Sequence, residues 1–572
     1  MDPGSPNRLI YGDNLLAMAA LLAGDEDNPS LRGKVDLIYI DPPFDSKADY
    51  RTKITLPGTT IEQKPTVIEQ FAYSDTWADG TASYLAMITP RLVLMRELLQ
   101  AKGTIYVHLN WRVGHFAKLV LDEIFGRENF LTEIIWSFNT RTMTSDWYAR
   151  KHNSLYFYCK APGHFFDVDA VRVAHIPGSL AQYDRGDEEG RRYKQQSGGA
   201  RSYLHELGQP CPDVWDIQIL GSRSPERTRY ETQKPSELLN RVIRASSPEG
   251  GLVADFFSGS GTTAAVAEAV NRRWVAVDIG KPATMITRKR LIDQDAKPFM
   301  YQAIGDYQVE HARSTLGRKY RVGDLARVVL DLYGALPLPP GENVNGSLGR
   351  LPGSRTLVFA DSPSRLTTVS TLRRAQGYRD VKLGGFDKVI VLGWNFSAGI
   401  GQDVASLHDD RLEVLVIPPD LLDRLKKKGA DKLASEVRFA SLQYLQAEVV
   451  SRKETSDGEE LRVSLINYVL LSPEAINLDD TNRRALRHVM NSEPLALIEY
   501  WAVDPNYDGE VFRSVWQDYR GNADSDGDEL RVVTAASLAL PPHDGDRTVC
   551  IRAVDVFGFE SEVVVVGVEG GS

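Results

Sequence analysis

The stretch "VDLIYIDPPF" (residues 35–44) places an acidic residue, two prolines and an aromatic ring directly after a run of strand-forming residues. This composition predicts a buried strand that ends at Asp41. In open α/β sheets, ligands bind at the carboxyl ends of parallel strands. Pro42 and Pro43 predict a stiff, extended turn, because each ring fixes φ and restricts the residue before it. The stretch therefore predicts a carboxylate held in a fixed geometry at a ligand-binding edge.

Two hydrogen-bond acceptors lie side by side in this turn, the carboxylate of Asp41 and the carbonyl of Pro42. Pro43 has no N–H, so its peptide link to Pro42 offers only an acceptor. A group with two donors to match is an exocyclic amine, such as the NH₂ of adenine or cytosine. Phe44 offers a ring on which a nucleobase can stack. The alternative is a structural turn followed by a core phenylalanine.

A second motif, "ADFFSGSGTTAAVAEAVN" (254–271), predicts a strand, a tight glycine turn and the start of a helix. Gly259 and Gly261 let the backbone turn sharply and approach a ligand, and the helix N-terminus suits a carboxylate, ribose or phosphate. Asp278 ends the next strand, where an acidic side chain accepts hydrogen bonds from ribose hydroxyls in such folds. The third glycine of a dinucleotide fingerprint is replaced by alanine, which disfavours NAD. A purely structural turn is the alternative.

Strands and helices alternate over residues 1–310, which predicts an α/β domain with a mostly parallel sheet covered on both faces. Within it, the polar segment 45–80 is too long for an ordinary connection and is a candidate mobile active-site loop. Periodicity is poor over 139–232, which indicates an inserted variable region. A second, smaller α/β unit is predicted over 320–475. Short strands over 488–572 predict a β-rich, sandwich-like C-terminal domain.

The composition is that of a soluble multidomain protein. The chain has 572 residues, of which 42% are hydrophobic and 25% charged, which excludes disordered and collagen-like classes. We expect a cytoplasmic protein with no membrane partner, because no apolar stretch is long enough for a span and the N-terminus lacks a signal sequence. The three cysteines fit neither a disulfide framework nor a metal cluster, so no metal is expected. A net charge of −10 requires any nucleic acid to bind a local basic surface.

Together the two motifs resemble those of the amino-methylating DNA methyltransferases, which use S-adenosylmethionine (SAM). The order, with "DPPF" before the glycine motif, is similar to their beta class, a circularly permuted version of a Rossmann-like methyltransferase fold. Further stretches match as well, namely "GDNLL" (12–16), "DEIFGRENF" (122–130) and "QKPSELL" (233–239). The combination looks most like the modification subunits of type III restriction-modification systems and their solitary relatives, over about residues 1–310.

The resemblance implies which residues bind the cofactor. They are Asp13, Asn14, Lys234, Pro235, Asp255, Phe257, Gly259, Gly261, Thr262 and Asp278. Phe257 and the two glycines are implied to shape the methionine pocket, and Asp278 to bind the ribose. Asp13, implied to lie near the adenine of SAM, is alternatively the N-cap of a helix over 14–23. Lys234 is alternatively a solvated lysine before a helix-opening proline.

The resemblance also implies how the chain would act on DNA. The catalytic residues would be Asp41, Pro42, Pro43 and Phe44. The two acceptors would hold both amino hydrogens of a flipped-out base and favour a pyramidal nitrogen as it attacks the SAM methyl group. The insert, where this family keeps its target-recognition region, offers the candidate DNA contacts Arg141, Arg150, Lys151, Arg223, Arg227 and Arg229. Scattered arginines on a solvated surface are the alternative.

The predicted function is N6-adenine methylation of double-stranded DNA, with a restriction or defence subunit and a second copy of the chain as implied partners. Family members that act on cytosine more often have serine at the first motif position, so Asp41 favours adenine, while N4-cytosine and RNA stay open. A nucleotide-dependent oxidoreductase would leave "DPPF" unexplained. A non-catalytic scaffold is disfavoured because both motifs are intact. Residues 320–572 carry no chemical motif and are predicted to serve partner binding, dimerisation or DNA clamping.

Overall fold

The chain forms two compact units in the computed structural model. The first unit comprises Met1–Lys47 and Phe71–Gly305, and the second comprises Ala48–Gln70 and Asp306–Ser572. The structure describes residues 6–26, 28–43, 52–63, 81–140, 144–196, 199–221, 223–228, 230, 232–304, 322–343, 345–362, 366–394, 396–397, 399–418, 421, 437, 439–441, 443–470, 476, 478–522 and 528–570. Within these ranges, each helix is too short or too polar to cross a membrane.

A nine-stranded sheet forms the middle of the first unit, in the order β11-β6-β7-β5-β2-β12-β13-β1-β14. Its strands are β1 (Asn7–Gly12), β2 (Val35–Ile40), β5 (Leu99–Leu109), β6 (Phe130–Ser137), β7 (His152–Cys159), β11 (Val214–Asp216), β12 (Leu252–Asp255), β13 (Arg273–Asp278) and β14 (Phe299–Ile304). The strands from β5 to β14 in this order are parallel, whereas β7 is antiparallel to both its neighbours. The predicted α/β class is thus confirmed for this unit.

Helices pack on both faces of this sheet. One face carries α1 (Asn14–Ala23), α3 (Thr81–Leu98) and α4 (Gly114–Phe125), and the other carries α6 (Ser236–Ser246), α7 (Thr262–Ala269) and α8 (Lys281–Asp293). Side chains alternate between the two faces along each strand. In β2, Ile38 and Ile40 pack with the first group, and Leu37 and Tyr39 with the second. A strand buried on both sides has an almost continuous apolar sequence, as "VDLIYI" does.

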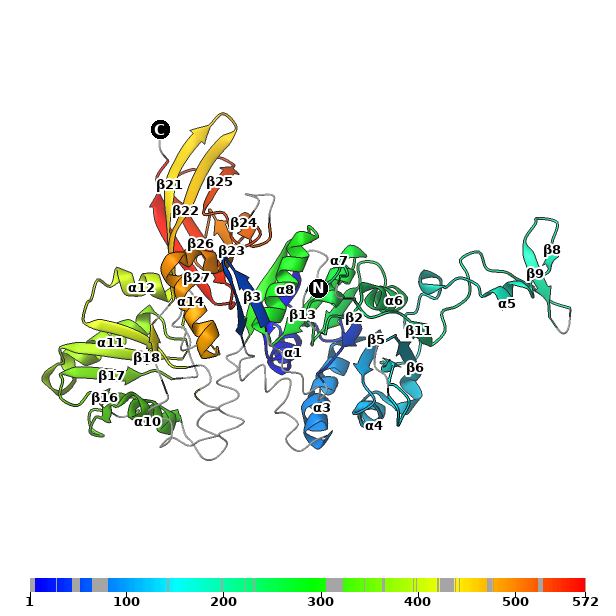
Figure 1. The fold of residues 1–572 in the computed structure, drawn as a ribbon, viewed down its shortest axis with the longest axis horizontal. Coiled ribbons are helices and arrows are strands. Elements are labelled where there is room, and N and C mark those ends of the chain that lie inside the picture. Colours follow the sequence, from blue (N-terminus) through cyan, green and yellow to red (C-terminus); the bar gives the residue numbers. More distant parts are fainter. Residues whose placement is uncertain are drawn as a thin grey trace. The chain divides into compact units, whose positions relative to one another are not determined.

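The predicted insert, 139–232, is only partly separate from the central sheet. Its strands β7 and β11 belong to that sheet. Strands β8 (Arg185–Gly186), β9 (Arg192–Gln195) and β10 (Arg201–Tyr203) form a small sheet of their own, and β8 and β9 extend away from α6 and β11 (Figure 1). The insert therefore contributes both to the core and to a projecting surface.

The segment after the "DPPF" motif contributes to the second unit. Strands β3 (Thr52–Leu56) and β4 (Thr59–Gln63) form an antiparallel hairpin, seen in blue beside the orange and red elements in Figure 1. Ile54, Leu56 and Ile61 are buried in the core of that unit. The prediction of a mobile loop over 45–80 is therefore wrong for residues 52–63, because their alternating apolar side chains pack into a core. The rest of that prediction lies outside the described residues.

Polar contacts also join this hairpin to the rest of the second unit. The amide of Glu62 donates to Asn482 Oδ1 of α14 (Asp480–Ser492) at 3.0 Å. The guanidinium of Arg520 donates to the carbonyl of Thr55. Both strands of the hairpin are thus hydrogen-bonded to other residues of the second unit.

The described residues of the second unit form three further sheets. One has the order β15-β16-β17-β18-β19-β20, with β15 (Leu336–Pro337), β16 (Leu348–Arg350), β17 (Thr356–Ala360), β18 (Lys388–Gly393), β19 (Leu412–Val416) and β20 (Ala440–Ser441), beside α10 (Val322–Tyr333), α11 (Val369–Val381) and α12 (Ile400–Ser406). The others are β21-β22-β25 and β24-β23-β26-β27, with β21 (Tyr444–Thr455), β22 (Gly458–Val469), β23 (Ile498–Asp504), β24 (Trp516–Tyr519), β25 (Ala535–Leu540), β26 (Arg547–Asp555) and β27 (Glu560–Val568).

This arrangement differs from the predicted boundary at 475. Strand β22, placed by its sequence position in the 320–475 unit, pairs with β25 in an antiparallel register. The apolar side chains of Leu461, Val463 and Leu465 pack in the same core as β25 and β23. Residues 444–469 therefore join the C-terminal strands, because their alternating apolar face is covered there.

We predict that Ile61→Ala destabilises the second unit by about 2–5 kcal/mol, the usual cost of truncating a buried isoleucine. Ile61 is fully buried. The matched control is Lys53→Ala on the same hairpin, since the Lys53 side chain is 71% exposed. Denaturant unfolding should show a change within about 0.5 kcal/mol for the control. Equal effects of the two substitutions would contradict the packing described here.

Candidate active site

The carboxyl ends of β2 and β12 lie next to each other, since the two strands pair in parallel through Leu37 with Val253 and Ile38 with Ala254. From this pair, β5 lies on the outer side of β2, and β13 lies on the outer side of β12. The chain thus continues from β2 to a strand on one side and from β12 to a strand on the other side. A switch point of this kind between two neighbouring strands forms a ligand-binding crevice. The "DPPF" motif leaves one strand there and the glycine turn leaves the other, so tertiary structure brings the two predicted motifs together.

Asp41 follows β2 and contacts two basic side chains. The Nζ of Lys234 forms an ion pair with its Oδ2 atom, and the Nδ1 of His108 lies 3.4 Å from its Oδ1 atom. The Asp41 side chain is 18% exposed, and Oδ1 is buried with no hydrogen-bond donor among the described residues. Pro42, next in the chain, is buried. One carboxylate oxygen is therefore neutralised, while the other can accept a further hydrogen bond.

His108 was not predicted from the sequence. It lies at the end of β5, with its Nδ1 atom 2.9 Å from the hydroxyl of Tyr39 and its ring edge-on to Trp136 at 5.3 Å between centroids. Burial lowers the pKa of His108 to about 4, against the opposing effect of Asp41. The imidazole is therefore neutral near pH 7, and Lys234 is the cation of this group. The sequence did contain a signal for His108, because the stretch "GTIYVHL" lies in a parallel strand that ends at the same edge of the sheet as β2.

The glycine turn is enforced by both conformation and space. Gly259 and Gly261 have φ values of 52° and 71°, and Gly261 caps α7. A Cβ atom on Gly261 would lie 2.4 Å from Cγ2 of Thr287, and one on Gly259 would lie 3.1 Å from the Tyr230 ring. The hydroxyl of Thr287 also donates to the carbonyl of Gly259 at 3.1 Å. The turn therefore excludes side chains at both positions.

Two buried carboxylates hold this turn in place. Asp278 accepts hydrogen bonds from the amides of Gly259 (2.7 Å) and Gly280 (2.8 Å). Asp255 accepts them from the Thr263 hydroxyl (2.5 Å) and the Phe257 amide (3.0 Å). Burial raises the pKa of Asp278 to about 6 and the pKa of Asp255 to about 7, although these hydrogen bonds oppose the shift.

Asp13 and Asn14 begin helix α1 beside the glycine motif. Asp13 caps the helix by accepting from the Leu15 amide at 2.7 Å, so the N-cap alternative for Asp13 is confirmed. Asn14 donates to the carbonyl of Phe256 at 2.7 Å. Arg91 of α3 lies 3.3 Å from the Asp13 carboxylate and donates to Asn14 Oδ1 at 2.5 Å. These contacts join α1 to the end of β12.

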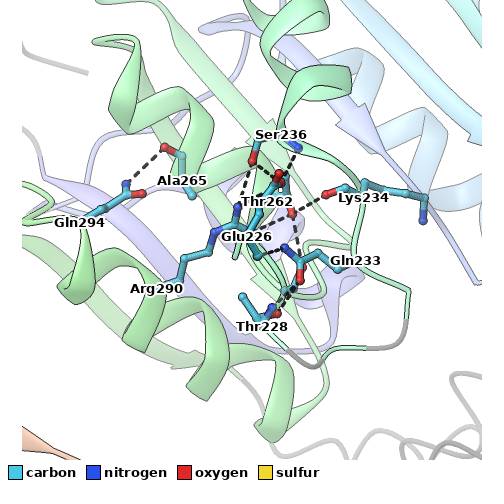
Figure 2. Close-up of polar contacts among 10 residues, drawn as sticks. Glu226, Thr228, Gln233, Lys234, Ser236, Thr262, Ala265, Arg290 and Gln294 are labelled. Carbon is cyan, nitrogen blue, oxygen red and sulfur yellow. Dashed lines mark hydrogen bonds and ion pairs between the residues drawn. The ribbon is translucent and has the colours of Figure 1, made fainter. Parts of the chain in front are cut away.

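A polar network holds the segment before α6 against α7 and α8, as Figure 2 shows. Arg290 of α8 donates to the hydroxyls of Thr262 (2.9 Å) and Ser236 (3.1 Å). Glu226 accepts from the amide and hydroxyl of Ser236, both at 2.6 Å. Thr262, the first residue of α7, donates to the carbonyl of Lys234 at 3.3 Å. The backbone that carries Lys234 is therefore fixed beside the glycine turn.

Of the neighbouring residues Lys234 and Pro235, Pro235 agrees with the alternative given for this segment and Lys234 contradicts it. Pro235 precedes α6 as its N-cap residue, consistent with a helix-opening proline. Lys234 is only 15% exposed and is paired with Asp41, so the alternative of a solvated lysine is wrong. Phe257 is half-buried against the core under α1 and α3.

The candidate DNA contacts lie in separate local settings. Phe44, Arg141 and Arg229 lie outside the described residues. The guanidinium of Arg150 lies 3.8 Å from the ring centre of Trp111, whose side chain is 50% exposed. Arg227 donates to the carbonyl of Leu220 at 3.3 Å, while Arg223 is exposed and Lys151 half-buried. Their role in binding DNA stays a prediction. In the described part of the chain, no group of three acidic, histidine or cysteine side chains is arranged for a metal ion.

We predict that Gly261→Ala destabilises the first unit more than Gly250→Ala does. Both glycines have a φ near 70°, which costs an alanine about 1–2 kcal/mol. Only at Gly261 would the new Cβ atom overlap a neighbour, whereas nothing lies within 4 Å at Gly250. The extra cost at Gly261 should be about 1–3 kcal/mol in denaturant unfolding. Equal losses would show that Thr287 moves aside freely.

We predict a pH dependence of stability that originates at Asp255. Because burial raises the pKa of Asp255 to about 7, the folded chain holds a proton that the unfolded chain releases near pH 4. The free energy of unfolding therefore falls as the pH rises through this window. Asp255→Asn should reduce this slope by on the order of 1 kcal/mol between pH 6 and 8 and leave the smaller part that Asp278 contributes. Asp216→Asn, at an exposed strand end, should leave the slope unchanged.

Comparison with known proteins agrees with this geometry. The model of the DNA methylase family, which covers N6 and N4 methylases, matches residues 35–289. The chain is 26% identical to the type II methyltransferase M.EcaI of Enterobacter cloacae, over 50% of this chain and 69% of that protein. It is 23% identical to the StyLTI Mod subunit, a type III restriction-modification enzyme of Salmonella typhimurium, over 47% and 50% of the two chains. It is 24% identical to the DNA adenine methyltransferase YhdJ of Escherichia coli, over 50% and 82%. Residues 35–289 are therefore similar to the DNA methylase family that the two motifs indicated.

Proposed function

We propose that this chain is a SAM-dependent DNA methyltransferase that methylates the N6 amino group of adenine in duplex DNA. The observation that carries the proposal is the position of Asp41. Its buried oxygen acceptor lies at the switch point of the sheet, where the glycine turn also ends. The similarity of residues 35–289 to the DNA methylase family supports the same reaction class.

The residues at the glycine turn fit SAM. The two glycines allow a tight turn packed against Thr287 and Tyr230, and the N-terminus of α7 behind it offers a positive dipole end to a carboxylate. Asp278 ends β13, and a carboxylate can accept more hydrogen bonds than the two it receives from backbone amides. SAM supplies an electrophilic methyl group when bound. The chain itself would hold the methionine part at the turn and the ribose at Asp278.

Asp41 would act on the amino group of the target base. The lone pair of that nitrogen is delocalised into the ring, so the amine is a poor nucleophile. Acceptors that bind its hydrogens best in the pyramidal form stabilise the transition state more than the ground state. The Asp41 carboxylate is one such acceptor, and the Pro42 carbonyl is the proposed second. His108, hydrogen-bonded to Tyr39, packs against Asp41 and restrains its orientation.

Adenine is favoured over cytosine on two grounds. Aspartate at the first position of the motif is more common in the adenine enzymes that this sequence resembles, and the relative YhdJ is named a DNA adenine methyltransferase. N4-cytosine methylation, which uses the same two acceptors, is the second candidate. The similarity to a type II methyltransferase and to a Mod subunit supports a place in restriction-modification, with a restriction subunit as a partner.

The second unit is proposed to bind a partner, a second copy of the chain or DNA. A chain truncated near residue 315 is an unsuitable test, because the hairpin 52–63 would lose the core that covers Ile54, Leu56 and Ile61. Substitutions on the surface of the intact second unit avoid this problem. Reduced assembly or reduced DNA binding, with the stability of the chain unchanged, would support the proposal.

The direct test is to map modified bases in DNA from cells that express the chain, and to measure methyl transfer from labelled SAM to that DNA. We expect N6-methyladenine at one recurring sequence. Asp41→Ala should slow transfer about 10²–10³-fold, as loss of one transition-state hydrogen bond does elsewhere. Asp25→Ala removes an exposed aspartate between α1 and β2, outside the insert, and should leave the rate unchanged.

Methylated cytosine at the mapped sites would support the second candidate instead. Full activity of Asp41→Ala would contradict the proposed chemistry in either case. Absence of methyl transfer by the unmodified chain to DNA that contains unmodified target sites would contradict the proposed activity itself.

A further inference from the structure

The contacts that Lys234 makes at Asp41 resemble those proposed for the amino group of the target base. Its Nζ atom donates to Oδ2 of Asp41 and to the carbonyl of Thr232, the second at 3.1 Å. One ammonium is thus held by a carboxylate and a backbone carbonyl. The proposed reaction presents the same two kinds of acceptor to the amino group of the base.

The pair is sheltered from solvent, since the Lys234 and Asp41 side chains are 15% and 18% exposed. A carboxylate in such a place is costly unless a cation accompanies it. Neutral His108 cannot supply that charge, because burial lowers its pKa to about 4. Lys234 is therefore the cation paired with Asp41 in this structure.

The backbone and the side chain of Lys234 are held differently. The carbonyl of Lys234 accepts from Thr262, and Thr262 in turn is bonded to Arg290. The lysine side chain is a flexible stem with four rotatable bonds. The ammonium can therefore leave Asp41 without displacing the segment that runs beside the glycine turn.

We propose that Lys234 is a positioning residue that occupies the Asp41 carboxylate when no base is bound and releases it when the target amino group enters. This role rests on the proposed function. Replacement of one N–H donor by another keeps the carboxylate hydrogen-bonded before and after the base enters. The role also differs from membership of the SAM pocket, which the sequence resemblance implied for this residue.

The test compares steady-state kinetics of the full-length chain and Lys234→Met with SAM and unmethylated duplex DNA that contains the mapped target. Because no ion pair has to be broken before the base binds, the KM for DNA should fall about fivefold, the worth of roughly 1 kcal/mol. The KM for SAM should stay within about twofold of the original, because the Lys234 carbonyl still accepts from Thr262. An increased KM for SAM with an unchanged KM for DNA would overturn the proposal and place Lys234 in the cofactor pocket.

Two variants serve as controls. Lys234→Arg keeps a cation on Asp41, so its KM for DNA should not fall. Lys160→Met removes a half-buried lysine that donates to the carbonyl of Leu99, at the opposite end of β5 from His108. Its KM for DNA should also not fall. A similar decrease in either control would overturn the proposal.

A double-mutant cycle with Asp41→Asn and Lys234→Met, measured by thermal unfolding, tests the interaction of the two side chains without an activity assay. Interacting residues give non-additive changes, so the double variant should lose less in Tm than the sum of the two single variants. Additive losses would show that the two side chains do not interact and would overturn the proposal. An unmodified chain that transfers no methyl group would instead refute the proposed function, while the cycle would still report the ion pair.

Discussion

The parallel pairing of β2 with β12 is the contact on which the site depends. It joins two strands from distant parts of the sequence through Leu37, Val253, Ile38 and Ala254. Their carboxyl ends consequently release the "DPPF" motif and the glycine turn at the same edge. Helices on both faces bury this pair, so a shift in register would move apolar side chains out of two cores at once. The position of Asp41 relative to the turn is therefore determined by the packing of the whole first unit.

The acidic residues of the site are stabilised in different ways. Asp255 and Asp278 receive hydrogen bonds from backbone amides and a hydroxyl, which are fixed parts of the turn. Asp41 is paired instead with a lysine on a flexible stem, and its second oxygen receives no such bond from the described residues. The partners of Asp255 and Asp278 are thus parts of the turn itself, whereas the partner of Asp41 is the end of a long side chain.

The route of the chain couples the two units. After the "DPPF" motif, the chain supplies hairpin 52–63 to the core of the second unit and then returns to α3 of the first unit. Neither unit is therefore a simple continuous segment. The buried apolar residues Ile54, Leu56 and Ile61 show that this hairpin is a structural part of the second unit.

The sequence alone determined the local features of this protein: the buried strand before Asp41, the glycine turn and the family that these motifs indicate. These features depend on alternation, backbone conformation and short-range hydrogen bonds, which neighbouring residues specify. Only the tertiary structure decided that Lys234 pairs with an aspartate 193 positions away, that neutral His108 lies beside it, and that hairpin 52–63 belongs to the second unit. Those contacts follow from the order of strands in the sheet and from which apolar faces cover each other, and no local pattern encodes either.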